Sequence, residues 1–416
     1  MKILVVSQYF WPENFRVNDL VQELAQRGHE ITVLTGYPNY PDGEVFEDFR
    51  NVPSAFSQFA GAKVYRVPLM ARGKNILRLA LNYMSFMLSA SVLGPLFLRG
   101  RRFDVVFVFQ LSPATVGIPA VVLGKLKKAP VVLLVLDLWP ESLAAVGAVK
   151  SRLFLTVIGQ LVRFIYNRCE LVLGQSKGSL GGIAKYCDDA SKIRYFPSWA
   201  EEVFNYDGVQ LAPEVPAQDG SFTLLFAGNI GEAQDFPAVL DAVERLKDNP
   251  TIRWLIVGDG RMADWLREEI KYRGLEKRFL LLGRFPFARM PSFYAHADAL
   301  LVSLKANPVF SLTIPGKVQS YLMAQKPLVG MIDGEGANVI REAHAGLVCS
   351  PGDSFGLAQA VEKLAAMSET ERLILGRNGR AYANQEFDRS ALIDRLEGWF
   401  GEIVSRSRIT KAGGIS

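Results

Sequence analysis

Cysteine and histidine, the residues that most often build disulfides and zinc sites, are scarce in this sequence. Three of each occur in 416 residues, and they lie far apart along the chain. No C-x-x-C pair is present, and no histidine has an acidic or cysteine companion at ligand spacing. We therefore expect a reducing compartment, no disulfide framework and no zinc site.

Signatures of several common enzyme classes are missing as well. The chain has neither a G-x-S-x-G elbow nor a G-x-x-x-x-G-K-[ST] loop, which removes the simplest arguments for a hydrolase or a P-loop enzyme. It has no D-x-D in a strand-end loop, so we expect no metal cofactor. It has no basic-aromatic module, so we expect no nucleic-acid partner.

The remaining composition is that of a well-packed enzyme. Hydrophobic residues make up 49% of the chain and charged residues 21%, and the length exceeds what one core usually holds. We therefore expect two domains. The net charge of +5 favours anionic partners such as phosphates or the inner leaflet of a membrane.

Two apolar segments bear on location. The first residues, "MKILVVSQYFWPE", carry one lysine and no small-residue cleavage site, so we expect a first strand and a cytoplasmic protein. The stretch from Ile76 to Leu98 is long enough to cross a membrane and is flanked by arginines. Arg78, Asn82 and Pro95 interrupt it. We favour a buried or surface-lying amphipathic helix over a span, with a plain interior helix as the simpler alternative.

Strands and amphipathic helices alternate along both halves of the chain. Near-continuous apolar runs such as "FDVVFVFQ", "APVVLLVLD", "SFTLLFAGNI" and "TIRWLIVGDG" are typical of parallel strands covered on both faces. The pattern predicts an α/β protein with two doubly wound, Rossmann-like domains. We place the first domain at residues 1–200, a linker at 201–220 and the second domain at 221–385. We expect residues 386–416 to form a helix that returns to the first domain.

A phosphate site is indicated in the second half. In "SLTIPGKVQSYLMA", Pro315 and Gly316 begin a helix, and Lys317 lies in its first turn, where a cation is unfavourable unless an anion is near. A solvated lysine at an ordinary helix start explains this stretch equally well. Gly228, just after a strand, marks a second phosphate-sized turn, and Lys305 is a third candidate.

A rival interpretation is a nicotinamide-dependent oxidoreductase. The segment "IVGDGRMA" fits G-x-G-x-x-A between a strand and a helix. The next strand ends at Gly283 and Arg284, where NAD binding would need an acid, although Arg284 suits the 2′-phosphate of NADP.

Several motifs resemble those of nucleotide-sugar-dependent glycosyltransferases of family 4. The likeness covers nearly the whole chain and is carried by "YFWPENFRVNDLVQELAQRGHEITVLTGYPNYPDG", "LDLWPES", "FAGNIGEAQ", "LLGRFP", "TIPGKVQSYLMAQKPLVG" and "GEGANVIREAHAGLVCSPGD". It implies a GT-B fold, in which the two domains face a central cleft. Together these motifs resemble the subgroup of L-fucosamine transferases of bacterial O-antigen and capsule assembly.

The resemblance also implies site residues. The "TIPGK" turn would bind the donor diphosphate, and "LLGRFP" would bind the nucleotide base of the donor. Where family members typically carry two glutamates, this chain has Thr313 and Tyr321, and Asn229 and Gln234 replace the usual arginine and lysine. The expected donor-binding residues are therefore Gly228, Asn229, Gln234, Arg284, Phe285, Lys305, Thr313, Pro315, Gly316, Lys317, Tyr321 and Glu335.

Glycosyl transfer also needs a base for the acceptor hydroxyl. Asp137, where many members have a histidine, is our first candidate, and Glu13 is the second. A helix cap explains Asp137 equally well, and Glu13 suits a solvated surface site. Retaining and inverting outcomes both stay open.

The expected reaction moves a sugar, such as N-acetyl-L-fucosamine, from a UDP-sugar to a polyprenyl-diphosphate-linked saccharide. The enzyme would need no metal and would lie peripherally on the inner face of the plasma membrane. A non-catalytic subunit that keeps the fold is a further alternative.

Overall fold

Two compact units make up the chain. The structure, a computed structural model, describes residues 1–41, 43–73, 75–145, 151–200, 209–217 and 220–413. Unit 1 comprises residues 1–196 together with 390–416, and unit 2 comprises residues 197–389. Residues 201–208 and 218–219, part of the predicted linker, lie outside the described residues.

Unit 1 is built on an eight-stranded sheet with the order β3-β4-β2-β1-β5-β6-β7-β8. All neighbouring strands run parallel except the antiparallel pair β3 and β4. The strands are β1 (Lys2–Val6), β2 (Glu30–Gly36), β3 (Gln58–Phe59), β4 (Ala62–Val67), β5 (Val105–Gln110), β6 (Val131–Val135), β7 (Leu171–Gly174) and β8 (Ile193–Tyr195). Every residue of β5 and β6 is buried, which explains their continuous apolar sequence.

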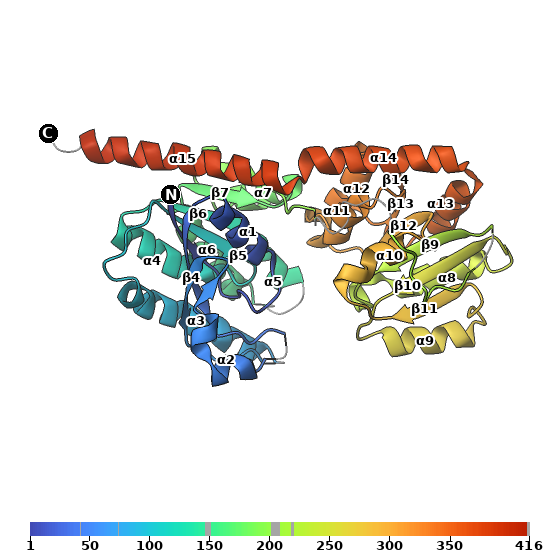
Figure 1. Ribbon diagram of the computed structural model, residues 1–416, viewed down its shortest axis with the longest axis horizontal. Helices are drawn as coiled ribbons and strands as arrows, with labels where there is room; N and C mark the ends of the chain where they lie inside the picture. Colours follow the sequence, from blue (N-terminus) through green and yellow to red (C-terminus); the bar gives the residue numbers. More distant parts are fainter. Residues whose placement is uncertain (42, 74, 146–150, 201–208, 218–219, 414–416) are drawn as a thin grey trace. The chain divides into compact units, whose positions relative to one another are not determined.

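Helices cover this sheet (Figure 1). They are α1 (Arg16–Gln26), α2 (Glu47–Asn51), α3 (Ile76–Phe97), α4 (Gly117–Lys127), α5 (Glu141–Ala145), α6 (Arg152–Tyr166), α7 (Lys177–Ala184) and α15 (Arg389–Gly413). The order of the strands reverses between β1 and β5, so the loops after these two strands flank the point where doubly wound sheets bind ligands.

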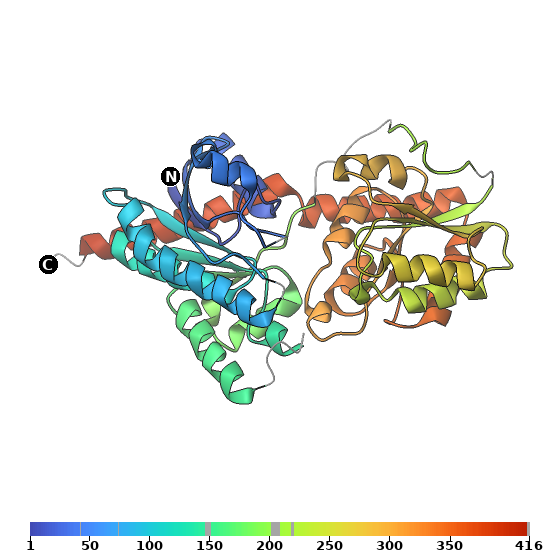
Figure 2. The same cartoon turned by 90° about the horizontal axis from the view of Figure 1, so that it is seen from below.

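The apolar stretch of the sequence forms α3, which lies in front of the unit 1 sheet in Figure 2. Its length and composition would allow it to cross a membrane. However, its Asn82 is fully buried, accepts hydrogen bonds from Gln8 Nε2 (2.7 Å) and the Tyr9 hydroxyl (3.2 Å), and donates to the Met70 carbonyl (2.6 Å). These contacts fix one face of α3 against the unit 1 sheet, because an amide buried without partners is costly.

Unit 2 contains a six-stranded parallel sheet with the order β11-β10-β9-β12-β13-β14. The strands are β9 (Phe222–Ala227), β10 (Ile252–Val257), β11 (Phe279–Gly283), β12 (Ala299–Ser303), β13 (Leu328–Met331) and β14 (Gly346–Cys349). The helices are α8 (Phe236–Arg245), α9 (Ala263–Tyr272), α10 (Met290–Tyr294), α11 (Gly316–Met323), α12 (Gly334–Glu342), α13 (Ser354–Ala366) and α14 (Glu369–Glu386). The strand order reverses between β9 and β12, so the loops after these strands mark the expected ligand site.

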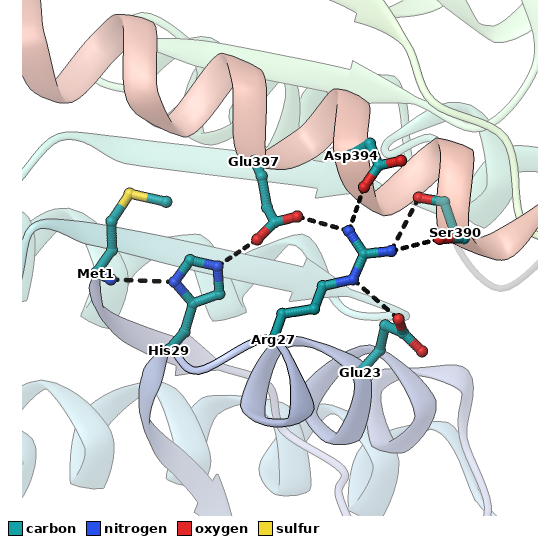
Figure 3. A network of polar contacts seen from close by, with 7 residues as sticks. All are labelled: Met1, Glu23, Arg27, His29, Ser390, Asp394 and Glu397. Carbon is teal, nitrogen blue, oxygen red and sulfur yellow. Dashed lines mark hydrogen bonds and ion pairs between the residues drawn. The ribbon is translucent and has the colours of Figure 1, made fainter.

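The last helix, α15, packs on unit 1 beside the N-terminus of the chain (Figure 1). Its buried residues include Phe400, whose ring lies 5.7 Å from that of Phe107 in β5. A polar network joins the same helix to α1 and β2 (Figure 3). Arg27 donates to Asp394, Glu397 and Ser390, and His29 links Glu397 to the amino terminus.

Arg27→Ala tests how much this network stabilises unit 1. The guanidinium has five donors, and its loss leaves two carboxylates of α15 without their main partner. We expect the free energy of unfolding to fall by about 1–3 kcal/mol in urea titrations, as for hydrogen bonds to charged groups. Arg395→Ala, on the same helix, is the control, because no ion pair or hydrogen bond of its side chain is described. Equal stability of both variants would contradict the assignment.

Candidate functional site

The loops at the reversal point of the unit 2 sheet surround Lys317. Its Nζ lies 3.5 Å from the centroid of the Phe226 ring at the end of β9. A Cβ placed on Gly228 would lie 2.8 Å from the same nitrogen, so only glycine leaves it this space. Burial lowers the pKa of Lys317 to about 7. No carboxylate of the described residues forms an ion pair with Lys317. A desolvated cation without a counter-ion favours the binding of an anion.

Two helix starts lie at this edge of the sheet without side-chain caps. Helix α11 begins at Gly316 after Pro315, and α12 begins at Gly334 after Asp333. Neither preceding residue caps its helix with a side chain. Gly336 lets the two helix starts pack closely, since a Cβ there would lie 2.8 Å from Pro315 Cδ. Free amides at helix starts are suited to bind phosphate oxygens.

The turn after β9 has a fixed conformation that its glycines and Gln234 explain. Gly228 has a φ of +140°, which favours glycine. The Gln234 Oε1 accepts from the Gly231 amide (3.1 Å) and from Asn229 Nδ2 (3.5 Å). The side-chain oxygen of Gln234 therefore stabilises the conformation of this turn.

Tyr321 takes a structural role in place of the expected donor contact. It is fully buried, and its hydroxyl bonds to both the amide (2.9 Å) and the carbonyl (3.1 Å) of Ala227. The hydroxyl thus pins α11 to the end of β9. Thr313 lies half-buried just before α11, and its hydroxyl donates to the Phe310 carbonyl (3.1 Å).

The other predicted donor residues lie at the same edge of the sheet but differ in exposure. Lys305 is exposed after β12. Burial raises the pKa of Asp235, and the charge of Lys305 opposes part of that rise. Arg284 is exposed at the end of β11, while the adjacent Phe285 packs on Phe293 with ring centroids 4.6 Å apart. Glu335 lies half-buried in the first turn of α12.

The structure argues against the nicotinamide interpretation. The "GDG" turn follows β10, whereas the phosphate loop of a dinucleotide site follows the strand at the reversal point, here β9. The turn is also packed against the loop after β9. The Ile230 amide donates to the Asp259 carbonyl (2.9 Å), and a Cβ on Gly260 would lie 2.3 Å from the Ile230 carbonyl oxygen. Backbone occupies the space that a pyrophosphate would need.

In unit 1, Asp137 lies half-buried after β6. Its Oδ2 accepts from the indole of Trp139 (3.1 Å), and its carbonyl accepts from Gln110 Nε2 (2.8 Å). The alternative of a helix cap is wrong, because α5 begins four residues later at Glu141. The structure describes no backbone amide bonded to the Asp137 carboxylate. One carboxylate oxygen therefore has no bonding partner among the described residues and is able to accept a proton.

Glu13 is buried, with an exposure of 3%, so the expectation of a solvated surface site is wrong. Its oxygens accept from the amides of Phe10 (3.1 Å), Asn39 (2.8 Å) and Tyr40 (2.8 Å). Burial raises its pKa, and these amides oppose that effect. Glu13 therefore joins the loops after β1 and β2, and its role as the second candidate base stays a prediction.

Residues that the sequence did not single out surround Asp137. Tyr83 of α3 is buried, and its ring lies 6.1 Å from that of Trp139. Burial raises the pKa of Tyr83, the charge of Arg72 opposes that rise and the charge of Asp137 adds to it. The guanidinium of Arg72 lies 5.3 Å from the Tyr40 ring centroid. Arg72 and Tyr83 follow β4, whereas Asp137 follows β6, so only the topology brings them together.

Two family models match the chain. The model described as glycosyl transferase 4-like domain matches residues 14–199, and that described as glycosyl transferases group 1 matches residues 221–367. Together these segments make up most of the sequence, and each falls within one unit.

Curated relatives carry similar names. A protein of Pseudomonas aeruginosa named as a glycosyltransferase, WbjE, is 25% identical over 86% of this chain and 88% of its own. One of Escherichia coli K12 named as a colanic acid biosynthesis glycosyl transferase, WcaI, is 26% identical over 94% of this chain and 98% of its own.

Solved structures share the fold. Anabaena HepE, in complex with UDP, superposes with a TM-score of 0.68 at 14% identity, covering 97% of this chain and 100% of HepE. A trehalose-6-phosphate protein of E. coli, bound with UDP-2-fluoro glucose, has a TM-score of 0.68 at 12% identity, covering 96% and 99%. The chain therefore belongs to the family 4 glycosyltransferases, as a nucleotide-sugar-dependent enzyme of the GT-B fold.

Proposed function

We propose that the protein transfers a sugar from a UDP-sugar to a polyprenyl-diphosphate-linked saccharide during assembly of a surface polysaccharide. The observation that carries the donor half is Lys317, a desolvated cation without a carboxylate partner in the described chain. It lies beside the uncapped start of α11. HepE binds UDP on the same fold, which supports UDP as the nucleotide.

The departing diphosphate must be stabilised as its charge develops. Lys317 and the first amides of α11 supply preorganised donors for this charge, each of which contributes about 10²- to 10³-fold to rate. We propose that these groups serve without a metal ion. Asp137 then accepts the proton of the acceptor hydroxyl, and general-base catalysis adds about 10²- to 10⁴-fold.

The acceptor half rests on α3. One face of this helix is exposed and apolar, formed by Leu77, Leu81, Met84, Leu88, Val92 and Leu96, which are between 39% and 70% exposed. The opposite face packs on unit 1. Arginines flank the helix, and basic residues beside an apolar face favour an anionic membrane surface. We propose that this face binds the inner leaflet, where a lipid-linked acceptor is held.

The sugar is proposed from resemblance and from names. The motifs resemble those of L-fucosamine transferases, and WcaI is named for the biosynthesis of colanic acid. We propose an N-acetylated deoxyhexosamine such as N-acetyl-L-fucosamine as the transferred sugar.

A transfer assay with vesicles tests the proposal. We expect the purified enzyme to co-sediment with anionic vesicles that contain a polyprenyl-diphosphate N-acetylhexosamine, and to release UDP from UDP-N-acetyl-L-fucosamine. UDP-glucose and GDP-fucose are the matched donor controls. Release from GDP-fucose alone would contradict the nucleotide, and failure to sediment would contradict the membrane site.

A further inference from the structure

Arg72 is a cation without an acidic partner on the acceptor side of unit 1. It is half-buried in the loop between β4 and α3, and no carboxylate of the described residues lies within ion-pair distance of it. Its backbone amide donates to Asn39 Oδ1 (2.9 Å), and its guanidinium lies over the Tyr40 ring, 5.3 Å from the ring centroid. A guanidinium held this way keeps donors free for a ligand.

A second arginine lies beside it. The stem of Arg78 packs on the backbone of Gly73, where a Cβ would lie 2.4 Å from Arg78 Cδ. Arg78 is exposed in the first turn of α3, with its amide bonded to Asn75 Oδ1 (2.8 Å). Neither arginine has an ion-pair partner among the described residues, and a doubly charged anion offers charge to both.

The residues around these two arginines indicate which kind of anionic ligand binds there. On one side lies the candidate base. Asn39 Oδ1 accepts from Arg72 and from Asn82, the residue before Tyr83, and the Tyr83 ring packs beside Trp139, whose indole donates to Asp137. On the other side begins the exposed apolar face of α3, where Leu77 is 70% exposed. A ligand that spans this site has an apolar chain, then a strong anion, then a sugar hydroxyl.

We propose that Arg72 and Arg78 bind the diphosphate of the lipid-linked acceptor, which places its prenyl chain on α3 and its sugar at Asp137. This inference rests on the proposed function and names the acceptor group that it needs. Arginine suits the task because its planar fork binds phosphate oxygens in pairs. Arg72 is thereby a residue that selects acceptors carrying a diphosphate.

Binding of farnesyl diphosphate tests the site without requiring turnover. Calorimetry is run with saturating UDP, which blocks the donor site around Lys317. We expect the wild type to bind this probe and Arg72→Ala to weaken binding about ten- to hundredfold. Arg72→Lys, which keeps the charge but not the fork, should restore part of the affinity.

Arg99→Ala is the matched control, because Arg99 is an exposed arginine just beyond the other end of α3. It should leave the affinity for farnesyl diphosphate unchanged and lower co-sedimentation with anionic vesicles as much as Arg72→Ala does. Equal loss of probe binding in both variants would reduce the effect to general charge and overturn the proposal. Binding to anionic vesicles without binding of farnesyl diphosphate would assign the arginines to phospholipid headgroups. A wild type that binds the probe but transfers no sugar refutes the proposed function alone.

Discussion

Lys317→Met is expected to raise the melting temperature of the ligand-free protein and to weaken its binding of UDP. Burial lowers the pKa of Lys317 to about 7, well below its value in an unfolded chain. Between these two values the unfolded state binds one proton more than the folded state, so stability rises with pH in that window. The charged lysine therefore destabilises the fold fully below pH 7, and this penalty disappears near pH 10.5.

The pH dependence of melting separates this effect from packing. The gain in melting temperature from Lys317→Met should be largest near pH 6 and should vanish near pH 10. For a unit of this size, 1 kcal/mol corresponds to about 2–4 °C. Lys247→Met, which removes an exposed lysine of unit 2, is the control and should leave the melting temperature unchanged at both pH values.

The affinity for UDP should decrease in Lys317→Met, although its melting temperature increases. The diphosphate stabilises the charged lysine, so Lys317→Met is expected to lose affinity about ten- to hundredfold. In the wild type, the affinity should fall by up to tenfold per pH unit above pH 7, because the free enzyme must then take up a proton. Calorimetry of UDP binding at several pH values measures both the loss of affinity in Lys317→Met and the pH dependence of the wild-type affinity. A variant that is less stable at pH 6 and binds UDP normally would make Lys317 a packing residue.

Asp137→Asn is expected to lower kcat about 10²- to 10⁴-fold while UDP affinity stays unchanged. Asparagine retains an oxygen that accepts from the Trp139 indole, so the local geometry and the melting temperature should be kept. The carboxylate that accepts the proton is lost. This separation follows from the position of Asp137 in unit 1, apart from the donor-binding residues of unit 2.

Steady-state kinetics and UDP calorimetry on the same preparation check this result. Glu141→Gln, four residues later, changes one carboxylate to an amide in the same segment and should retain turnover. Trp139→Phe removes the indole donor and should lower kcat less than Asp137→Asn does. Unchanged turnover in Asp137→Asn would show that Asp137 is not the catalytic base.

Most of the fold was predictable because parallel strands covered on both faces are read directly as apolar runs. Strands β9 and β10 of unit 2 fall within the predicted runs "SFTLLFAGNI" and "TIRWLIVGDG". The side chain of Lys317 lies beside Gly228. The short edge strand β8 was missed because its residues are only partly buried and lack a continuous apolar pattern.

The site was less predictable, because side-chain direction depends on packing. Tyr321 was expected to contact the donor, yet it faces the end of β9, since helix α11 turns this position inward. Glu13 was expected at a solvated surface, yet three amides hold it in the interior. Arg72 and Tyr83 meet Asp137 only through the strand order, which no local motif encodes.

Unit 1 is assembled from both ends of the polypeptide, with unit 2 inserted between them. During synthesis, the residues that contact Arg27 and Phe107 emerge from the ribosome after the whole of unit 2. A nascent chain that stops before Ser390 therefore leaves open to chaperones the surface of unit 1 that α15 covers.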